Sequence, residues 1–341
     1  MWVTDNLVNN MKTSLTTNME NLDKIIKQIF FYRIKVTFIT LRPLYLSEYK
    51  GSAYRGWLFD AFRRMYCDQD HHTKCKKTQK SDACSSVQNC PCSLLFESPL
   101  KDDHHLYGKY TYPPRPYIII PSNSRERMMV KDQRFSFEII LIGNGYTGFY
   151  DPLIQAFNKM SEIGLGTRKT RCKFLKAEFV SVIDQVSPDP QIISFDQLPS
   201  VAVKNRIKLA FKDPVRLQGY NSDSQKRGFV ETKPSFAVLA DNLARRIVLL
   251  GHLYCNTDWL STDFVREVAQ DVTIESDNLT RQNWIRHSGS KDMNMCFDGY
   301  VGDITYIGNL EQWSNLLTIG AWLHTGSVAT FGLGKYSILD E

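Results

Sequence analysis

The order of strands and helices constrains the fold of this chain more than any other feature. The first half reads strand, helix, strand, strand, helix, strand, because alternating apolar residues mark the strands and apolar faces at helical spacing mark the helices. The predicted elements are strands 30–41, 117–120, 134–142 and 169–182, a helix over 52–66, and a second helix capped by Asp151 with Pro152 in its first turn. This is the order of the ferredoxin-like, split βαβ fold.

The same order recurs after a proline-containing linker at 187–190. Asn309 and Gln312 are predicted to form a capping box at the last helix. The predicted elements are strands 204–217, 272–274, 294–307 and 335–339, helices 235–250 and 310–323, and a helical piece at 258–270. We therefore predict an α+β protein with two tandem ferredoxin-like (βαββαβ, RRM-like) domains, 30–186 and 200–341, after an N-terminal extension at 1–29 with at most a short helix.

Length, composition and charge agree with this prediction. The 341 residues suit two domains, and 43% apolar with 23% charged residues are typical of a globular protein. No apolar run is long enough to span a membrane and the N-terminus lacks an export signal, so we expect a cytoplasmic protein with no membrane partner. The net charge of +6 permits nucleic-acid binding without requiring it.

Gly326, Gly332 and Gly334 form a glycine array between the predicted last helix and the final strand. Glycine reaches backbone angles that are closed to other residues, and successive exposed N–H groups in such a turn form a concave anion site. With Lys335 directly after the array, we predict contact with a nucleic-acid backbone. The alternative is a tight connection that needs glycine only for its geometry.

A basic stretch follows a second glycine turn, Gly164-Leu165-Gly166, and consists of Arg168, Lys169, Arg171 and Lys173. Alternate residues of a strand share a face, so Lys169, Arg171 and Lys173 are expected to point the same way and to bind nucleic acid. Charges that alternate with apolar residues also occur on any half-buried strand, which is the alternative interpretation.

Cysteines crowd into a predicted insertion at 67–116 of the first domain. Without an export signal we expect reduced thiols, and the cluster lacks the C-x2-C spacing of a strong zinc motif. A structural zinc ion held by four thiols would order an insertion with little core of its own. We predict Cys67, Cys75, Cys84 and Cys90 as its ligands, with Cys92 as the spare; the alternative is a loop of unliganded cysteines.

Several short segments of the sequence, in the order in which a known family carries them, give the chain a family resemblance. They are Tyr54-Arg55-Gly56-Trp57-Leu58-Phe59, Cys90-Pro91-Cys92-Ser93-Leu94-Leu95-Phe96-Glu97, Gly164-Leu165-Gly166, Gly299-Tyr300-Val301-Gly302, and the stretch from His324 to Tyr336. The chain resembles the repeat-associated mysterious proteins (RAMPs) of CRISPR systems. Among these it is most similar to the CRISPR-associated endoribonuclease that cuts precursor CRISPR RNA.

The resemblance implies cleavage once per repeat of a CRISPR transcript without a metal ion. In that family the ribose 2′-hydroxyl attacks the phosphate and leaves a 2′,3′-cyclic phosphate and a 5′-hydroxyl. No cofactor is then needed for catalysis, and DNA is not an expected substrate because it lacks the nucleophile. The implied partners are CRISPR repeat RNA and, downstream, a CRISPR effector complex.

The resemblance also directs attention to the first helix, where many members carry a catalytic histidine. This chain has no histidine between Leu41 and Tyr66. We therefore predict Lys50, Tyr54 and Arg55 as a group that positions RNA and stabilises charge, although a free tyrosine or lysine is a poor base at neutral pH. His324, beside the glycine array, is the alternative base or acid. Helix packing, and a histidine favoured at a helix C-terminus, are the structural alternatives.

Two other functions remain open at this point. A non-catalytic RNA-binding RAMP subunit of a CRISPR effector complex would share the folds and the glycine array, and the missing histidine favours it. A zinc-stabilised protein-interaction module would explain the cysteines but leave the C-terminal array unexplained.

Overall fold

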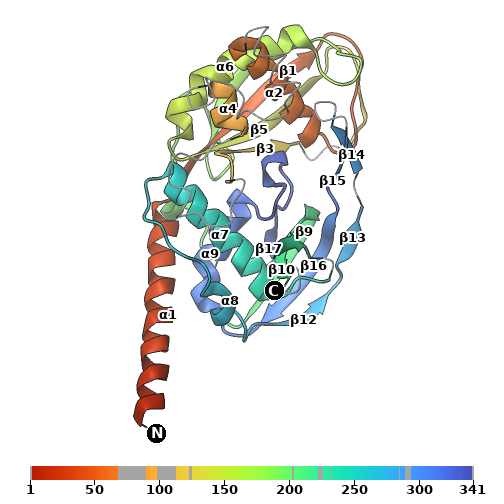
Figure 1. Cartoon of the computed structure of the whole chain (residues 1–341). Coiled ribbons are helices and arrows are strands. Elements are labelled where there is room, and N and C mark those ends of the chain that lie inside the picture. The colour runs from red at the N-terminus through yellow and green to blue at the C-terminus, as the bar shows by residue number, and fades with distance from the viewer. Residues whose placement is uncertain are drawn as a thin grey trace.

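Two ferredoxin-like domains stack end to end, with a long N-terminal helix beside them (Figure 1). The computed structural model describes residues 2–67, 90–97, 113–122, 125–201, 203–221, 226–230, 232–283, 285–288 and 293–339. Within these residues, no helix is long and apolar enough to cross a membrane.

The first domain contains an antiparallel sheet in the order β3-β5-β1-β6-β7. β1 (Phe30–Thr40) lies at its centre between β5 (Arg134–Ile142) and β6 (Cys172–Val180), and β3 (Tyr117–Pro121) pairs with β5. The predicted ferredoxin-like domain is confirmed. Short additional strands are β2 (Leu44–Tyr45), β4 (Met128–Met129), β7 (Val186–Ser187) and β8 (Ile193–Ser194).

Helices α2 (Gly51–Tyr66) and α6 (Gly145–Ile163) cover one face of this sheet, with the short α4 (Pro91–Phe96) beside α2. Alternate β1 residues such as Phe38 point into this layer, where the Phe38 and Trp57 rings lie 4.8 Å apart. The Trp57 indole donates a hydrogen bond of 2.9 Å to the carbonyl oxygen of Met160, which ties α2 to α6.

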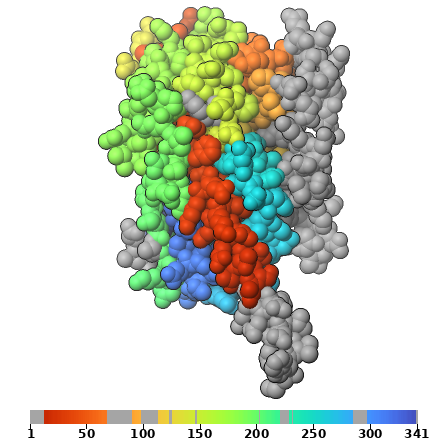
Figure 2. All heavy atoms as spheres, turned by 90° about the vertical axis from the view of Figure 1, so that its left-hand side faces the viewer, coloured from red at the N-terminus to blue at the C-terminus, as the bar shows by residue number. Residues whose placement is uncertain are grey.

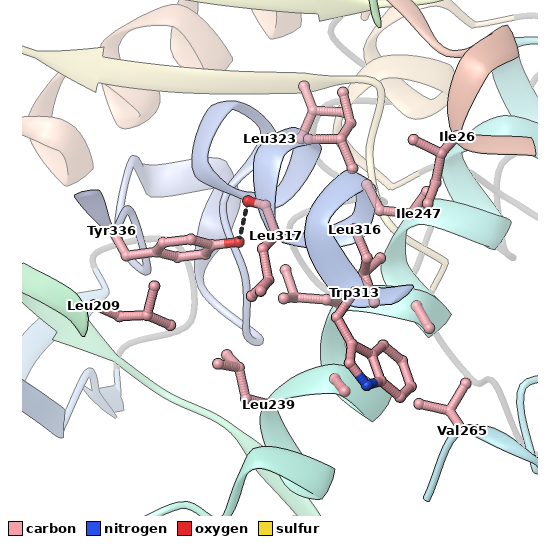
Figure 3. Packing of buried hydrophobic residues seen from close by; sticks show 14 of the residues in the cluster. Ile26, Leu209, Leu239, Ile247, Val265, Trp313, Leu316, Leu317, Leu323 and Tyr336 are labelled. Atoms are coloured by element: carbon pink, nitrogen blue, oxygen red, sulfur yellow. Dashed lines mark hydrogen bonds between the residues drawn. The ribbon is translucent and has the colours of Figure 1, made fainter. Parts of the chain in front are cut away.

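The second domain repeats this plan with a sheet in the order β12-β16-β9-β17. Helices α7 (Phe236–Tyr254) and α9 (Ser314–Leu323) pack on it, and Trp313 and Tyr336 lie in the core (Figure 3). The Tyr336 hydroxyl donates to the carbonyl oxygen of Leu317 at 2.7 Å. The remaining elements are β9 (Arg206–Val215), β10 (Gln218–Asn221), β11 (Lys226–Phe229), α8 (Val265–Val268), β12 (Thr273–Asp277), β13 (Thr280–Gln282), β14 (Ile285–Ser288), β15 (Met293–Cys296), β16 (Gly299–Ile307) and β17 (Ser337–Leu339), with 3-10 turns η2 (Phe195–Gln197), η3 (Glu311–Trp313) and η4 (Ala329–Phe331).

The two domains share one continuous core. Phe31, Ile118 and Ile140 lie on the first sheet, yet they belong to the same buried cluster as the second domain's helices. The Phe31 ring lies 6.1 Å from that of Trp322 in α9. Burial of this apolar surface holds the domains in a fixed relation.

The N-terminal extension forms one long helix, α1 (Trp2–Gln28), rather than the short helix expected. Leu22, Ile25 and Ile26 are buried, and their spacing gives one apolar stripe that packs against α7 and α9. Figure 2 shows α1 in red along the side of the molecule, beside the cyan atoms of α7. The prediction failed because this stripe is short and lies among polar residues.

Several predicted element boundaries were also wrong. The helix expected from Asp151 begins at Gly145 and continues through Pro152. The capping box at the last helix does not form, because a 3-10 turn ending at the buried Trp313 precedes α9. The helical piece at 258–270 shrinks to α8, and the strand expected from Lys169 begins at Cys172.

Replacing Ile26 by alanine tests whether α1 is part of the core. We expect Ile26→Ala to lower the free energy of unfolding by about 2–5 kcal/mol, because it deletes a fully buried side chain. The exposed Gln28→Ala on the same helix is the control and should change it by less than about 0.5 kcal/mol. Urea unfolding measures both, and equal small effects would contradict the packing of α1.

Candidate nucleic-acid interface

The glycine loop, residues 324–335, joins α9 to β17 and docks onto the first domain. Gly332 has a φ of +87°, and a Cβ atom there would lie 2.4 Å from the carbonyl oxygen of Ile119 in β3. The Tyr49 hydroxyl donates a hydrogen bond to the carbonyl oxygen of Phe331. Glycine is required at this position because backbone atoms of the other domain occupy the space of a side chain.

Five backbone amides of the glycine loop already donate hydrogen bonds to carbonyl oxygens of the chain. The amides of Thr325, Ser327, Phe331, Gly332 and Gly334 bond to the carbonyl oxygens of Gly334, Arg216, Val328, Ala329 and Pro214. A Cβ at Gly326 or Gly334 would likewise meet a backbone oxygen. In the free protein the array therefore acts through packing, as the geometric alternative expects, and its contact with RNA stays a prediction.

Arg55, in the first turns of α2, lies where the loop meets the first domain. Its Nε donates to the Tyr117 hydroxyl at 3.0 Å. Its guanidinium carbon lies 4.7 Å from the ring centroid of Phe331 and 5.5 Å from that of Phe96. The second domain thus holds Arg55 through Phe331, a cation–π contact between the domains.

Arg115 lies beside Arg55 and was not recognised from the sequence. Its Nε donates to the carbonyl oxygen of Phe96 at 2.6 Å. Burial lowers the pKa of Arg115, and the positive charge of Arg55 lowers it further, while Glu97 opposes the shift. Among the described residues, neither guanidinium forms an ion pair, so the two together form an anion-attracting site suited to phosphate.

Lys50 and Tyr54 occupy different environments from those predicted. Lys50 caps α2, is 1% exposed, and donates from Nζ to the carbonyl oxygen of Glu48 at 3.3 Å. Burial lowers its pKa, against the opposing charges of Glu126 and Glu48. Tyr54 is 0% exposed with its ring 4.6 Å from that of Phe137, so it packs in the core rather than at a surface that RNA reaches.

His324 is also fully buried, whereas an acid or base in catalysis must be accessible to RNA. It ends α9 with a φ of +58°, and its Nδ1 lies 3.2 Å from the carbonyl oxygen of Leu333. Burial lowers the pKa of His324 to about 3, and the charges of Lys335 and Arg246 add to the shift. His324 is therefore neutral at physiological pH and stabilises the fold of the loop.

Charged groups surround the end of the glycine loop. Burial raises the pKa of Asp213 in β9, and the charges of Arg125, Lys335 and Lys212 oppose that shift. Lys335 is crowded by protein, which lowers its pKa, and the charge of Arg33 in β1 adds to the effect. The sequence hid Asp213 because it lies in an otherwise ordinary strand pattern.

The predicted basic stretch lies elsewhere, at the turn before β6 and beside β2. Lys169 has a φ of +48° and pairs with Asp60 at 3.3 Å, so it does not share a strand face with Arg171 and Lys173. The Arg168 guanidinium lies 5.1 Å from the ring centroid of Tyr45. Arg168, Arg171 and Lys173 are exposed, and their RNA contact stays a prediction.

Two of the predicted zinc ligands face each other. A hydrogen bond that the Cys90 thiol donates to Cys67, together with burial, raises the pKa of Cys90, and both residues belong to the predicted cysteine-rich insertion. Cys75 and Cys84 lie outside the described residues. A tetrahedral zinc site needs four ligands, of which this pair would be two; Cys92 is buried in the core, and the zinc site stays a prediction.

Comparisons with known proteins identify the family. The model for CRISPR-associated endoribonuclease Cas6 matches residues 209–336, and the N-terminal domain model AF_1859_N matches 29–206. Among solved structures, the product complex of a Thermus thermophilus Cas6 aligns with a TM-score of 0.56 at 12% identity, over 91% of this chain and 100% of that chain. A partial Cas6-RT-Cas1–Cas2 complex aligns with a TM-score of 0.52 at 13% identity, over 92% of this chain and 46% of that chain. No curated protein matches the sequence.

Tandem ferredoxin-like domains joined through a C-terminal glycine loop are the fold that this chain shares with these solved structures. More particularly, residues 209–336 match the CRISPR-associated endoribonuclease Cas6, so the chain is a CRISPR-associated protein of the Cas6/RAMP type.

The buried His324 predicts a loss of stability in mild acid. Its pKa is about 3 in the folded protein and 6.5 in the unfolded chain, so protons favour unfolding as the pH falls through this window. Between pH 7 and pH 5 the loss from this group is about 2 kcal/mol. We expect His324→Asn, which cannot titrate, to lose less stability over that range in urea unfolding. A parallel loss in both proteins would contradict the assignment.

Metal analysis tests the zinc site. Protein purified without chelator should contain about one zinc ion per chain, and Cys67→Ser or Cys90→Ser should lower that content, because a three-thiolate site binds more weakly. The buried Cys255→Ser, in the second domain, is the control and should leave it unchanged. Zinc well below one ion per chain in the unaltered protein would rule the site out.

Proposed function

We propose that this chain cuts repeat RNA of CRISPR transcripts at the domain junction, without a metal ion in the reaction. The observation that carries the proposal is the pair Arg55 and Arg115, whose guanidiniums have no ion-pair partner among the described residues and lie beside the glycine loop. Two adjacent guanidiniums that form no ion pair within the described part of the chain, next to a loop matched by the Cas6 model, suit a scissile phosphate.

In the proposed reaction, the ribose 2′-hydroxyl attacks the adjacent phosphorus and the bond to the 5′ oxygen breaks. The products are a 2′,3′-cyclic phosphate and a 5′-hydroxyl, whose oxygen takes its proton from water as it leaves. Arg55 and Arg115 bind the non-bridging oxygens and stabilise the negative charge of the phosphorane. Such stabilisation by fixed donors is usually the largest single contribution to catalysis. Their contacts with Phe331, Tyr117 and the Phe96 carbonyl hold them in place before RNA arrives.

Lys50 is the proposed proton acceptor for the 2′-hydroxyl. Burial lowers its pKa, which is the direction that favours a general base, and it lies five residues before Arg55 at the start of α2. Its Nζ must leave the carbonyl oxygen of Glu48 to reach RNA. The fully buried His324 has no part in this proposal.

The second candidate function is RNA binding without cleavage, as a RAMP subunit of an effector complex. The burial of His324 favours this function, because the histidine of the glycine loop cannot reach a ligand in this conformation. Both functions predict repeat-RNA binding, and only the first predicts a cut.

Incubating the protein with a labelled repeat RNA in EDTA separates the two. Cleavage at one position, abolished by a 2′-deoxy sugar at that position and absent with all-DNA repeat, supports the nuclease. EDTA could stop cleavage either by removing a metal ion that catalysis needs or by unfolding the cysteine-rich insertion. The zinc content of the same sample separates these two causes. Tight binding with no cut under any condition would refute the nuclease and leave the binding subunit.

Substitutions at the junction give the corresponding rates. Arg55→Ala should slow single-turnover cleavage by about 10²–10³-fold, the effect of losing one donor to a developing oxyanion. Arg64→Ala, at an exposed position of the same helix, is the control and should leave the rate within about twofold. Lys50→Arg keeps a long basic side chain but cannot accept a proton near neutral pH, so it should slow cleavage while RNA affinity holds. Unchanged rates in both Arg55→Ala and Lys50→Arg would contradict this site.

A further inference from the structure

The short ladder of β2 and β4 has one buried and one exposed face. Leu44 pairs with Met129 on the buried face. Tyr45 pairs with Met128 on the other face, and these two are 49% and 48% exposed. The buried pair packs the ladder against the domain, and the Tyr45 ring is not part of the hydrophobic core.

One guanidinium lies against this ring, and two further arginines have their backbone on the same edge. The Arg168 guanidinium lies 5.1 Å from its centroid, and the backbone of Arg127 accepts a hydrogen bond from the amide of Leu46, next to Tyr45. Arg171 lies on the same edge, where its carbonyl accepts from the amide of Leu41 at 3.1 Å. Within the described part of the chain, the side chains of Arg127, Arg168 and Arg171 form no ion pair.

Two nearby carboxylates form ion pairs, and a third, Glu126, lies close enough to Lys50 to affect its pKa. Asp60 pairs with Lys169, and Glu48 pairs with Arg125 at 3.2 Å. The edge therefore carries a net positive charge around one exposed aromatic ring, a combination that suits a nucleic-acid backbone with its bases turned toward the protein.

The ring is also close to the domain junction. Tyr45 is four residues from Tyr49, whose hydroxyl binds the glycine loop, so their Cα atoms lie within about 14 Å. Arg125, in the segment that leads to β4, lies near enough to Asp213 to affect its pKa.

We propose that Tyr45 stacks on a base of a single-stranded RNA segment that flanks the cleavage site, with Arg168 holding the adjacent phosphate. The inference rests on the proposed function for the identity of the RNA. It adds Tyr45 of β2 to the RNA contact that the sequence predicts for Arg168. A base in single-stranded RNA exposes its π-face, whereas duplex RNA buries it in the stack, so the site selects single-stranded RNA.

The charge pattern favours RNA over a protein partner. A protein interface that used Tyr45 and Met128 would carry few uncompensated charges at its centre. Here the arginine nearest the ring has no carboxylate partner among the described residues, and it would be buried unpaired under a protein.

The test uses the full chain and an oligoadenylate RNA of about 15 nucleotides, with 2-aminopurine at one position to report stacking. Tyr45→Ala should weaken binding about tenfold and abolish the 2-aminopurine quenching, since stacking on one aromatic ring contributes about that factor. Tyr45→Trp should keep affinity within about twofold and keep the quenching. Val130→Ala, an exposed apolar residue of the same edge at 56% exposure, is the matched control and should change neither.

Several outcomes would overturn the inference. One is a Tyr45→Ala protein that binds and quenches like the unaltered chain. Another is equal weakening by Tyr45→Ala and Val130→Ala, or equal weakening for duplex RNA, which would indicate a general surface effect or a protein interface. Cleavage of repeat RNA, followed in parallel, keeps the two proposals apart: a chain that cuts repeat RNA but shows no Tyr45 effect disproves only the stacking subsite.

Discussion

The docking of the glycine loop onto the first domain is the contact on which the rest of the structure depends. The Phe331 carbonyl accepts from Tyr49 and lies so close to Gly51 that a Cβ there would be 2.1 Å away. Gly332 presses on β3 with similar closeness. Because backbone meets backbone on both sides, the loop cannot shift without separating the domains. The same contact places the Phe331 ring against Arg55, so the geometry of the candidate site is a consequence of how the domains join.

Buried cations held by carbonyl oxygens, rather than by carboxylates, are the second constraint. Arg246 donates to the carbonyl oxygen of Leu323 at 3.0 Å and Arg115 to that of Phe96. Burial lowers the pKa of Arg246 to about 10, a measure of how poorly this interior solvates charge. Carbonyl oxygens fix the position of a guanidinium without neutralising it. The junction therefore keeps a positive potential that a carboxylate partner would cancel, and a phosphate gains from it.

Local sequence pattern was enough to predict both sheets, because strand periodicity and the order of elements survive in single stretches of chain. It was not enough where long-range packing decides. The α1 stripe becomes a helix through its contacts with α7 and α9, which lie far away along the chain. Tyr54 and His324 were assigned to a site from their motifs, yet their exposure depends on partners in other elements. Arg115 could not be found at all, since only folding brings its loop beside Arg55.

The two domains each carry a glycine turn before their last strand, but the turn at Gly166 and the glycine loop at 324–335 make different contacts. In the first domain the turn at Gly166 packs on β2, where its Cβ would lie 3.1 Å from the Tyr45 carbonyl, and Arg168 of that turn covers the Tyr45 ring. In the second domain the loop itself supplies the ring, Phe331, and Arg55 of the first domain covers it. Phe331 is 8% exposed because a whole domain packs around it, whereas Tyr45 has no such neighbour among the described residues and stays half exposed. The same pairing of arginine and aromatic ring thus closes a junction in one case and leaves a surface for a ligand in the other.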